Sequence, residues 1–211
     1  MNAWIKPEYH IRETVGPKAD GPMYKVGEAP AIAIYKAIAE LAEHPEVWNR
    51  YTMRTRLLEN SPHRDVDDIW LRYRDWSEFN PENPQDFAGP HVSTWYAAYY
   101  LLPQVKALVD WVISEIIPEG SEIGGVLITK IKSGDSVLRH DDSKHWHSEY
   151  YKDKFMCHLQ SAPGQYFSYD ERSYGARTGD VVKFDNLIPH SVSNESDVDR
   201  ISLILATRAP D

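Results

Sequence analysis

The chain has 211 residues and a mass of 24.3 kDa, which is enough to bury one sizeable hydrophobic core. Its hydrophobic content of 42% and charged content of 26% match an ordinary globular protein and exclude a disordered chain. With 32 acidic and 23 basic residues the formal charge is -9, so we expect neither nucleic acid nor an anionic membrane surface as a partner.

Cysteine usage and the apolar runs predict a reducing, aqueous location. Cys157 is the only cysteine and has no internal partner for a disulfide. No basic stretch followed by an apolar run opens the sequence, so no secretory signal is predicted. No apolar run approaches the roughly 18 residues that cross a bilayer. We therefore expect a cytoplasmic protein without a membrane-spanning segment.

The first 120 residues are predicted to hold the helices. Prolines and glycines without periodicity predict an extended, turn-rich arm over residues 1–27. Apolar residues recur at helical spacing over residues 31–42, directly after Pro30, which suits a first helical position. A second amphipathic helix is predicted over residues 103–117.

The segment between these helices alternates in places and is predicted to form strands within residues 51–74, broken at Asn60, Ser61 and Pro62. Residues 79–90 are rich in proline and asparagine and predict a loop. Such a length of loop is often functional.

After residue 120 no helix is apparent, and short apolar segments alternate with turn signals. The predicted strands cover residues 123–131, 154–159, 165–169, 180–184, 191–193 and 200–207. Helices followed by strands predict an α+β chain of one domain, residues 1–211, in which the helix-rich residues 1–120 brace an antiparallel sandwich or jelly roll. Residues 121–208 would form this core.

A candidate metal site joins two segments of the strand-rich half. His140 and Asp142 are two positions apart, so on a strand both point to one face and can reach one ion. His190 would supply a third ligand from a distant strand. Two histidines and one carboxylate leave positions open on Fe(II) for a chelating cosubstrate and O2. Residues 63–65 contain a chance His-x-Asp, and Asp141 is the alternative carboxylate, although it should point to the opposite face.

Arg200 begins an apolar strand and is the candidate anion site. A buried, unpaired charge is costly, so Arg200 is best explained if it faces an anion inside the fold. A guanidinium binds a carboxylate through two parallel hydrogen bonds, and the Ser202 hydroxyl on the same face adds a third. The alternative is an exposed edge-strand arginine paired with Asp197 or Asp199.

The order of these motifs resembles the Fe(II)/2-oxoglutarate-dependent oxygenases. It comprises His140-x-Asp142, Gly179-Asp180, Pro189-His190-Ser191-Val192 and Arg200-x-Ser202. The run over residues 184–205 looks like the aspartyl/asparaginyl β-hydroxylase branch, which includes free-amino-acid hydroxylases. The resemblance covers residues 123–207 and implies a double-stranded β-helix, a cupin-like jelly roll.

By this resemblance the three candidate ligands would hold Fe(II) at the catalytic centre, with 2-oxoglutarate and O2 as cosubstrates. Arg200 would bind the distal carboxylate of 2-oxoglutarate, and His158 looks like the family's strand histidine beside the cosubstrate. Met156 departs from the family, because a basic residue often stands there. The loop after Asp142 is also longer than the family's usual connection.

The resemblance further implies an amino acid, or an amino-acid side chain of a peptide, as the substrate. Arg72 and Arg74, together with Lys132, would suit its carboxylate. Trp146 and His147 follow the first ligands and are candidates for a lid over the iron. For each of these pairs the alternative is a structural role, as solvated strand residues or as loop packing.

The predicted function is hydroxylation of an unactivated C–H bond, coupled to oxidative decarboxylation of 2-oxoglutarate. The Asp142 carboxylate would occupy the position that a halide needs, which favours hydroxylation over halogenation. Two alternatives stay open. One is a cupin-like protein that binds a metal or small ligand without turnover, and the other is a zinc or manganese isomerase or hydrolase with further ligands such as His145 or His147. The oligomeric state is not predicted.

Overall fold

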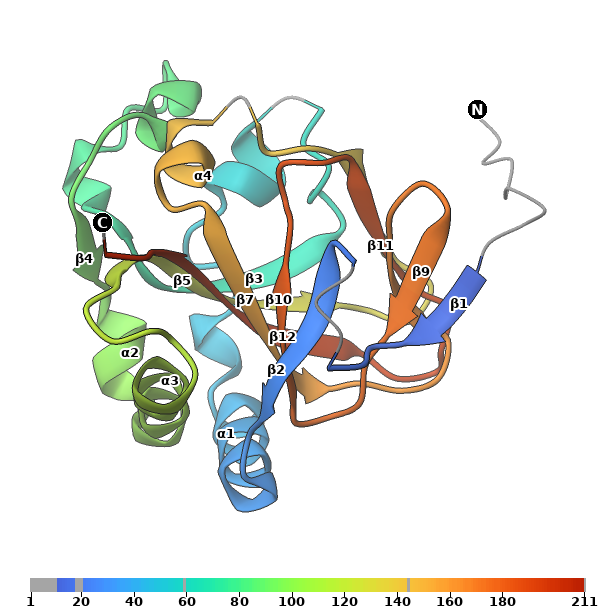
Figure 1. Ribbon diagram of the computed structural model, residues 1–211. Coiled ribbons are helices and arrows are strands. Elements are labelled where there is room, and N and C mark those ends of the chain that lie inside the picture. Colours follow the sequence, from blue (N-terminus) through green and yellow to red (C-terminus); the bar gives the residue numbers. More distant parts are fainter. Residues whose placement is uncertain (1–10, 18–20, 59, 144, 211) are drawn as a thin grey trace.

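Two antiparallel-rich β-sheets packed face to face form the centre of the molecule (Figure 1). The computed structural model describes residues 11–17, 21–58, 60–143 and 145–210. Within them, the smaller sheet has five strands in the order β1 (Ile11–Thr14), β9 (Arg172–Gly175), β8 (Gln165–Ser168), β11 (His190–Asn194) and β6 (Ser136–His140). The larger sheet has seven in the order β2 (Met23–Glu28), β10 (Asp180–Phe184), β7 (Asp153–Gln160), β12 (Arg200–Arg208), β5 (Glu122–Ile131), β3 (Val66–Arg74) and β4 (Ser93–Trp95).

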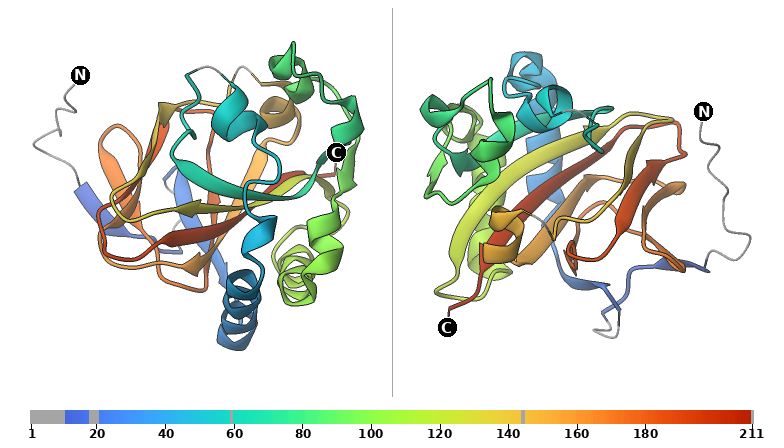
Figure 2. Two further views of the ribbon diagram at one scale, coloured as in Figure 1. Left: turned by 180° about the vertical axis from the view of Figure 1, so that it is seen from behind. Right: turned by 90° about the horizontal axis from the view of Figure 1, so that it is seen from above.

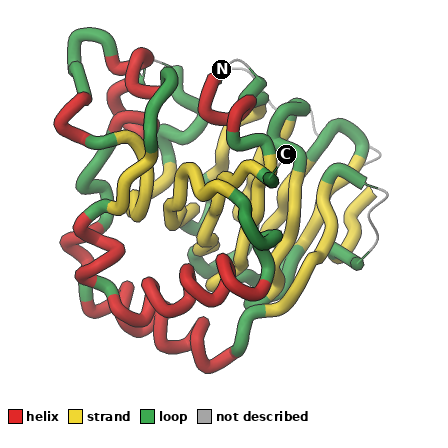
Figure 3. The backbone as a smooth tube through the Cα atoms, turned by 60° about the vertical axis from the view of Figure 1, so that its left-hand side comes forward, coloured by secondary structure: helices red, strands yellow, loops and turns green. Residues whose placement is uncertain are grey.

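The helices that cover the outer face of the larger sheet are α1 (Ala31–Glu43), α2 (Ala97–Leu101) and α3 (Pro103–Glu115). A further helix, α4 (Trp146–Tyr150), lies apart from them and contacts the inner side of β5 through His147 and Gly125. The chain also makes short helical turns at Pro45–Val47, Met53–Leu57, Trp76–Glu78 and Pro84–Ala88, the second of which is π-helical. Figure 2 shows α1 and α3 side by side beneath the strands, and Figure 3 shows the long helices below the strands and shorter helical segments above them. Among the described residues, no helix has the length and apolarity to cross a bilayer.

The larger sheet is buried on both faces, which explains its long apolar strands. Along β12, Ile201, Leu203 and Leu205 point outward into a core shared with α1 and α3. The alternate residues Ser202 and Ile204 point inward, toward the smaller sheet, where they line a cavity. The period of two therefore separates a structural face from a functional face on the same strands.

The structure confirms the predicted α+β class and the double-stranded β-helix core braced by helices. Both long helices begin where proline predicts a start, α1 after Pro30 and α3 at Pro103. The six strands predicted after residue 120 are present, each within about two residues of its expected bounds, an ordinary scatter for strand ends.

Several predictions of secondary structure were wrong. The described part of residues 1–27, predicted as an arm, holds β1 and β2, which pair with β9 and β10. Residues 1–10 and 18–20 lie outside the described residues. Short strands at β4, β6 and β9 were not predicted, α4 contradicts the absence of helices after residue 120, and Met53–Leu57 is helical where strands were expected. The edge strands β1, β2 and β6 depend on partners distant in sequence, which local patterns do not reveal.

Glu40 of α1 joins the two long helices. Its carboxylate is buried, and Oε2 accepts hydrogen bonds from the backbone N–H groups of Gln104 and Val105, both at 2.9 Å. These groups belong to the first turn of α3, where backbone donors lack partners within the helix. The negative charge also opposes the positive end of the α3 dipole. Glu40 thus caps a helix that is remote from it in sequence.

We predict that Glu40→Ala lowers the free energy of unfolding by about 1 to 3 kcal/mol, because two buried N–H groups lose their acceptor. Urea denaturation of the purified protein measures this change. Glu43→Ala, which removes an exposed carboxylate from the same helix, is the matched control and should change little. Equal losses in both variants would show that the capping contact contributes nothing specific.

Candidate metal centre

The pairing of β11 with β6 brings the two candidate histidine ligands together. The antiparallel register sets His190 opposite His140, and their ring centroids are 4.4 Å apart. Asp142 follows β6 directly, and its backbone N–H donates to the Asn186 carbonyl at 3.0 Å, which fixes this loop against the one before β11. One ligand atom from each of His140, Asp142 and His190 lies within 4.8 Å of the other two.

Hydrogen bonds orient all three side chains for metal binding. The Nδ1 atoms of His140 and His190 donate to the carbonyls of Leu138 at 2.7 Å and of Ile188 at 2.9 Å. Because a carbonyl can only accept, each Nδ1 carries a proton, and in the neutral imidazole this places the lone pair on Nε2. Such contacts to the second ring nitrogen are usual for histidines that bind a metal.

The Asp142 carboxylate is held in the same way. Its Oδ2 accepts a hydrogen bond from Asn186 Nδ2 at 2.8 Å, while Oδ1 lies 3.7 Å from His140 Nε2. Asp141, the alternative carboxylate, accepts hydrogen bonds from the N–H and hydroxyl groups of Ser143 and belongs to no converging donor set found among the described residues. The donors that converge therefore include Asp142.

The electrostatics favour the protonation states that metal ligands need. Burial lowers the pKa of His140, and the neighbouring His190 lowers it further. Burial alone would raise the pKa of Asp142, but the Asn186 hydrogen bond and the nearby His140 hold it below its ordinary value. At neutral pH the His140 imidazole is thus neutral and the Asp142 carboxylate is charged, as binding of a divalent metal requires.

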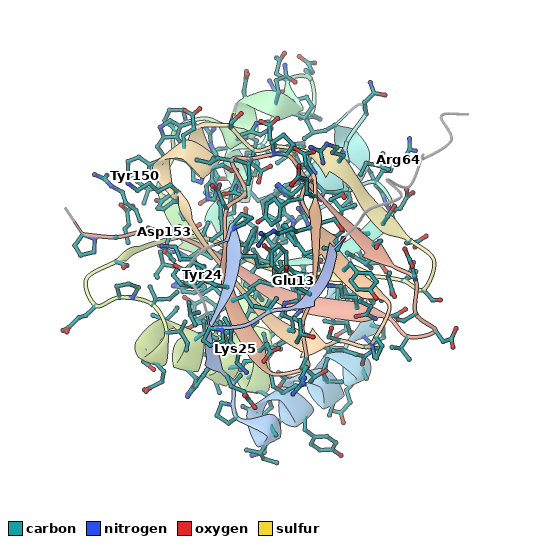
Figure 4. All side chains as sticks on the ribbon, turned by 45° about the vertical axis from the view of Figure 1, so that its right-hand side comes forward. Glu13, Tyr24, Lys25, Arg64, Tyr150 and Asp153 are labelled. Carbon is teal, nitrogen blue, oxygen red and sulfur yellow. The ribbon has the colours of Figure 1, made fainter. Side chains whose placement is uncertain are left out.

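Two rings pack against the candidate ligands. Phe167 stacks on His190 at 5.1 Å, and His63 meets His140 edge to face at 4.7 Å. Sequence spacing predicted residues 63–65 to be a chance triplet, and Arg64 indeed lies at the edge of the molecule (Figure 4). His63 points inward instead, and its Nδ1 is buried without a hydrogen-bond partner in the described part of the chain. No pattern in the sequence indicates this contact.

The candidate ligands line a cavity of about 320 Å³ between the sheets, and Arg200 lies in its wall. Arg200 is only 3% exposed, on a strand that has neighbours on both sides, so the alternative of an exposed edge residue is wrong. Its guanidinium lies 3.3 Å from the Tyr166 carbonyl and 3.5 Å from Met156 Sδ, and no described carboxylate pairs with it. Burial lowers its pKa to about 10, so it is charged at neutral pH.

Ser202 and His158 lie beside Arg200. Ser202 is buried in the cavity wall on the same face of β12, and His158 of β7 is its cross-strand partner. Both ring nitrogens of His158 are buried and lack hydrogen-bond partners among the described residues. Burial lowers the pKa of His158 far below its usual value, and the Arg200 charge adds to this. An unpaired guanidinium beside unsatisfied polar atoms suits an anionic ligand.

The arginines predicted to bind substrate, Arg72 and Arg74, are not among the residues that line the cavity. Arg72 donates to the Ile123 carbonyl at 3.1 Å, and Arg74 pairs with Glu78 at 2.8 Å. The pairing of β3 with β5 shifts register between Trp70 and Arg72, as a β-bulge does, and Trp70 and Tyr73 face the cavity instead.

Lys132, the third predicted substrate contact, lies 3.2 Å from Asp67 and is also absent from the cavity wall. Lys154 of β7, which sequence reasoning missed, does line the cavity. Burial lowers its pKa to about 8, and the Asp142 charge opposes that shift. The sequence offered little indication of this position, because Lys154 is one of many lysines in the chain and is not part of a motif.

Of the two candidate lid residues, only one side chain faces the cavity. His147 of α4 lines the cavity, and its Nε2 accepts the backbone N–H of Gly125 at 3.0 Å. Trp146 does not line the cavity and instead stacks on Tyr150, with ring centroids 4.8 Å apart. The predicted lid is therefore a short helix that presents one side chain inward and packs the other on its own surface.

Comparisons with known proteins agree with this geometry. Three solved structures share the fold: a 2OG-Fe(II) oxygenase family oxidoreductase from Burkholderia pseudomallei (13% identity, TM-score 0.52, 94% of each chain covered), a viral collagen prolyl hydroxylase from Paramecium bursaria Chlorella virus-1 in its 2OG complex (10%, 0.52, 92% and 100%), and a Pseudomonas putida prolyl-4-hydroxylase (15%, 0.50, 92% and 95%). None of the curated proteins matches the chain.

A family model gives the assignment that such low identities do not. The model of the aspartyl/asparaginyl beta-hydroxylases matches residues 40–210, well beyond the residues 123–207 on which the resemblance was first based. The matched segment contains every residue of the converging donor set as well as Arg200, Ser202 and His158. The chain therefore belongs to the aspartyl/asparaginyl β-hydroxylase family of 2-oxoglutarate-dependent dioxygenases.

Proposed function

We propose that this protein uses Fe(II), held by His140, Asp142 and His190, and 2-oxoglutarate, held by Arg200 and Ser202, to hydroxylate an unactivated C–H bond. The observation that carries the proposal is one cavity that contains both a converging His-Asp-His donor set and a buried guanidinium without a carboxylate partner among the described residues. The substrate would be an amino acid or an amino-acid side chain.

When bound, the metal and cosubstrate supply the oxidising chemistry, and the protein supplies binding, orientation and a dry site. The Nδ1–H groups of His140 and His190 donate to backbone carbonyls, which orients both rings and leaves their Nε2 atoms to hold the metal. Asn186 orients the Asp142 carboxylate by donating a hydrogen bond to its Oδ2 atom. Arg200 offers two parallel donors to a distal carboxylate. These residues fix both ends of a dicarboxylic cosubstrate.

The cavity wall near Arg200 is apolar apart from these donors. Val137, Phe167, Val192 and Ile204 line it, and the first three belong to a packed core cluster. Exclusion of water strengthens charge-assisted hydrogen bonds and protects a reactive centre from side reactions. The arrangement supports a site in which oxidation is confined to a bound substrate.

The alternative functions fit the geometry less well. A cupin-like protein that only binds a metal would not need an unpaired, buried arginine in the same cavity, since such a charge is costly. A zinc or manganese hydrolase with His147 as a further ligand would need the Nε2 atom that already accepts the Gly125 N–H. The Asp142 carboxylate also leaves no ligand position for a halide at its place on the metal, which favours hydroxylation.

The test of this function is a turnover screen with the Fe(II)-loaded protein. We expect O2 uptake that requires 2-oxoglutarate and yields succinate, CO2 and a hydroxylated product in equal amounts. Amino acids, short peptides and cell extract serve as substrate sources, and product is identified by mass spectrometry. If neither O2 uptake nor succinate formation depends on 2-oxoglutarate in any mixture, the proposal fails.

Removal of a candidate ligand should abolish metal binding and leave the fold intact. We expect His140→Ala and His190→Ala to lose high-affinity Fe(II) binding, because each removes one of the three donors, and Asp142→Ala to bind iron more weakly and to lose turnover. Metal content after anaerobic loading gives the measurement, with circular dichroism as the check on folding. Asp141→Ala is the matched control and should keep both properties. Normal iron content in either histidine variant would refute the assignment.

Arg200→Lys should weaken 2-oxoglutarate binding and leave iron binding unchanged. Lysine keeps the charge but loses the planar pair of donors, which costs about 1.5 to 3 kcal/mol, or on the order of tenfold to a hundredfold in affinity. Titration of 2-oxoglutarate into the anaerobic Fe(II) protein measures this through the absorption band of the chelate. Arg139→Lys, at an exposed position, controls for loss of a guanidinium elsewhere. Equal affinities for wild type and Arg200→Lys would place the cosubstrate away from Arg200.

A further inference from the structure

Lys154 is a second buried cation on the wall of the same cavity. It is 6% exposed and lies on the inner face of β7, opposite Ala206 of β12. Arg200 begins β12, so the two cations are separated by roughly 20 Å of strand, at the usual rise of about 3.3 Å per residue. One cavity therefore has a positive group near each end of β12.

In the described part of the chain, Lys154 lacks partners of the kind that Arg54 and Asp141 have in the same cavity wall. Among the described residues, none accepts a hydrogen bond from its Nζ or lies in an ion pair with it. Arg54, by contrast, makes two hydrogen bonds to the buried Asp68, at 2.7 and 2.9 Å. Asp141 accepts both donors of Ser143. The Asp142 carboxylate acts on Lys154 only through its charge.

A metal at the candidate site would make this ammonium costlier. Asp142 would then neutralise part of the metal charge, and the dication itself would repel Lys154. A buried ammonium in that position needs an anion close by. In the proposed function the cosubstrate does not provide one, since its 2-oxo acid end binds the metal and its distal carboxylate binds Arg200. The remaining source is the substrate.

The rest of the wall on this side of the cavity suits a small organic molecule. Trp70, Tyr73 and Leu127 contribute apolar surface. The Trp70 indole Nε1 is buried and has no hydrogen-bond partner in the described chain, so it is a second open donor. With a total volume of about 320 Å³ that the cosubstrate must share, the cavity fits a small ligand rather than a long peptide.

We propose that Lys154 binds the carboxylate of the substrate, and that the substrate is a small free carboxylic acid with an apolar body, such as a free amino acid. This inference rests on the proposed function and makes it more specific. Lys154 takes the role that Arg72, Arg74 and Lys132 were expected to share before the structure placed them outside the cavity.

The test uses the full chain loaded with Fe(II) and 2-oxoglutarate without O2, so that binding is measured in the absence of turnover. The probes are the free proteinogenic L-amino acids, each compared by calorimetry with its primary amide, which lacks the carboxylate. We expect at least one acid to bind, and its amide to bind at least about tenfold more weakly, as loss of a charge-assisted hydrogen bond predicts.

Lys154→Met should lower the affinity for that acid by about tenfold to a hundredfold and leave the affinity for the amide unchanged. Lys154→Arg keeps a cation and should retain most of the binding. Lys183→Met is the matched control, because Lys183 lies on the neighbouring β10, pairs with Asp153 at 2.6 Å and does not line the cavity. Asp153 lies near the edge of the molecule in Figure 4, away from the cavity. Thermal unfolding confirms that each variant is folded.

Three results would overturn the inference. The first is that no acid binds, or that acids and amides bind the wild-type protein equally well. The second is that Lys154→Met binds the acid as tightly as wild type does, or that it weakens the binding of 2-oxoglutarate instead, which would assign Lys154 to the cosubstrate. The third is that capped peptides with aspartate or glutamate side chains bind through Lys154 while free acids do not, which would make the substrate a peptide. If 2-oxoglutarate still binds in these cases, the oxygenase function stands, whereas absent 2-oxoglutarate binding contradicts the function itself.

Discussion

The alternation of side chains along the strands of the larger sheet is the constraint on which the rest of the structure depends. Because successive residues point to opposite faces, one set of residues on β12 packs against the helices and the other set faces the cavity. A shift of one residue in register would bury Arg200 among leucines and expose Leu203 to the cavity. The placement of Arg200 and Ser202 in the cavity therefore depends on the register in which β12 pairs with β5 and β7.

The cavity wall contains several cationic side chains, although the chain as a whole carries a net negative charge. The protein carries a formal charge of -9, yet its cavity wall contains Arg54, Lys154 and Arg200. Arg54 is matched by Asp68, while the other two have no carboxylate within ion-pair distance among the described residues. Buried cations that are left unpaired indicate anionic ligands, and the excess of acidic residues outside does not oppose this because surface charges are screened over about 10 Å.

At the candidate metal centre, strand pairing brings together side chains that no contiguous sequence motif contains. His140 and His190 are adjacent because β6 and β11 pair, and each imidazole is oriented by a carbonyl two residues earlier in its own chain segment. Asn186 connects the two segments through its side chain and its carbonyl. Candidate ligands from two segments that are distant in sequence are thus brought together by strand pairing, and the same kind of backbone contact orients the histidine of each segment.

Much of this could be predicted from the sequence. Proline positions and helical spacing located α1 and α3, and the order of His140, Asp142, His190 and Arg200 indicated the family, because those residue types must recur wherever the same ligands are held. A charged residue at the start of an apolar strand was informative by itself, since burial of Arg200 demands an anion.

Other features were decided only by the tertiary structure. The strands β1, β2 and β6 form through pairing with segments distant in sequence, and their own sequences carry too little pattern to be recognised alone. A bulge in β3 turned Tyr73 rather than Arg72 into the cavity, and no propensity scale reports a bulge. His63, from a loop, and Lys154, from β7, line the cavity although neither belongs to a sequence motif of the site. Sequence determines which chemistry is available, whereas register and long-range packing determine which side chains meet.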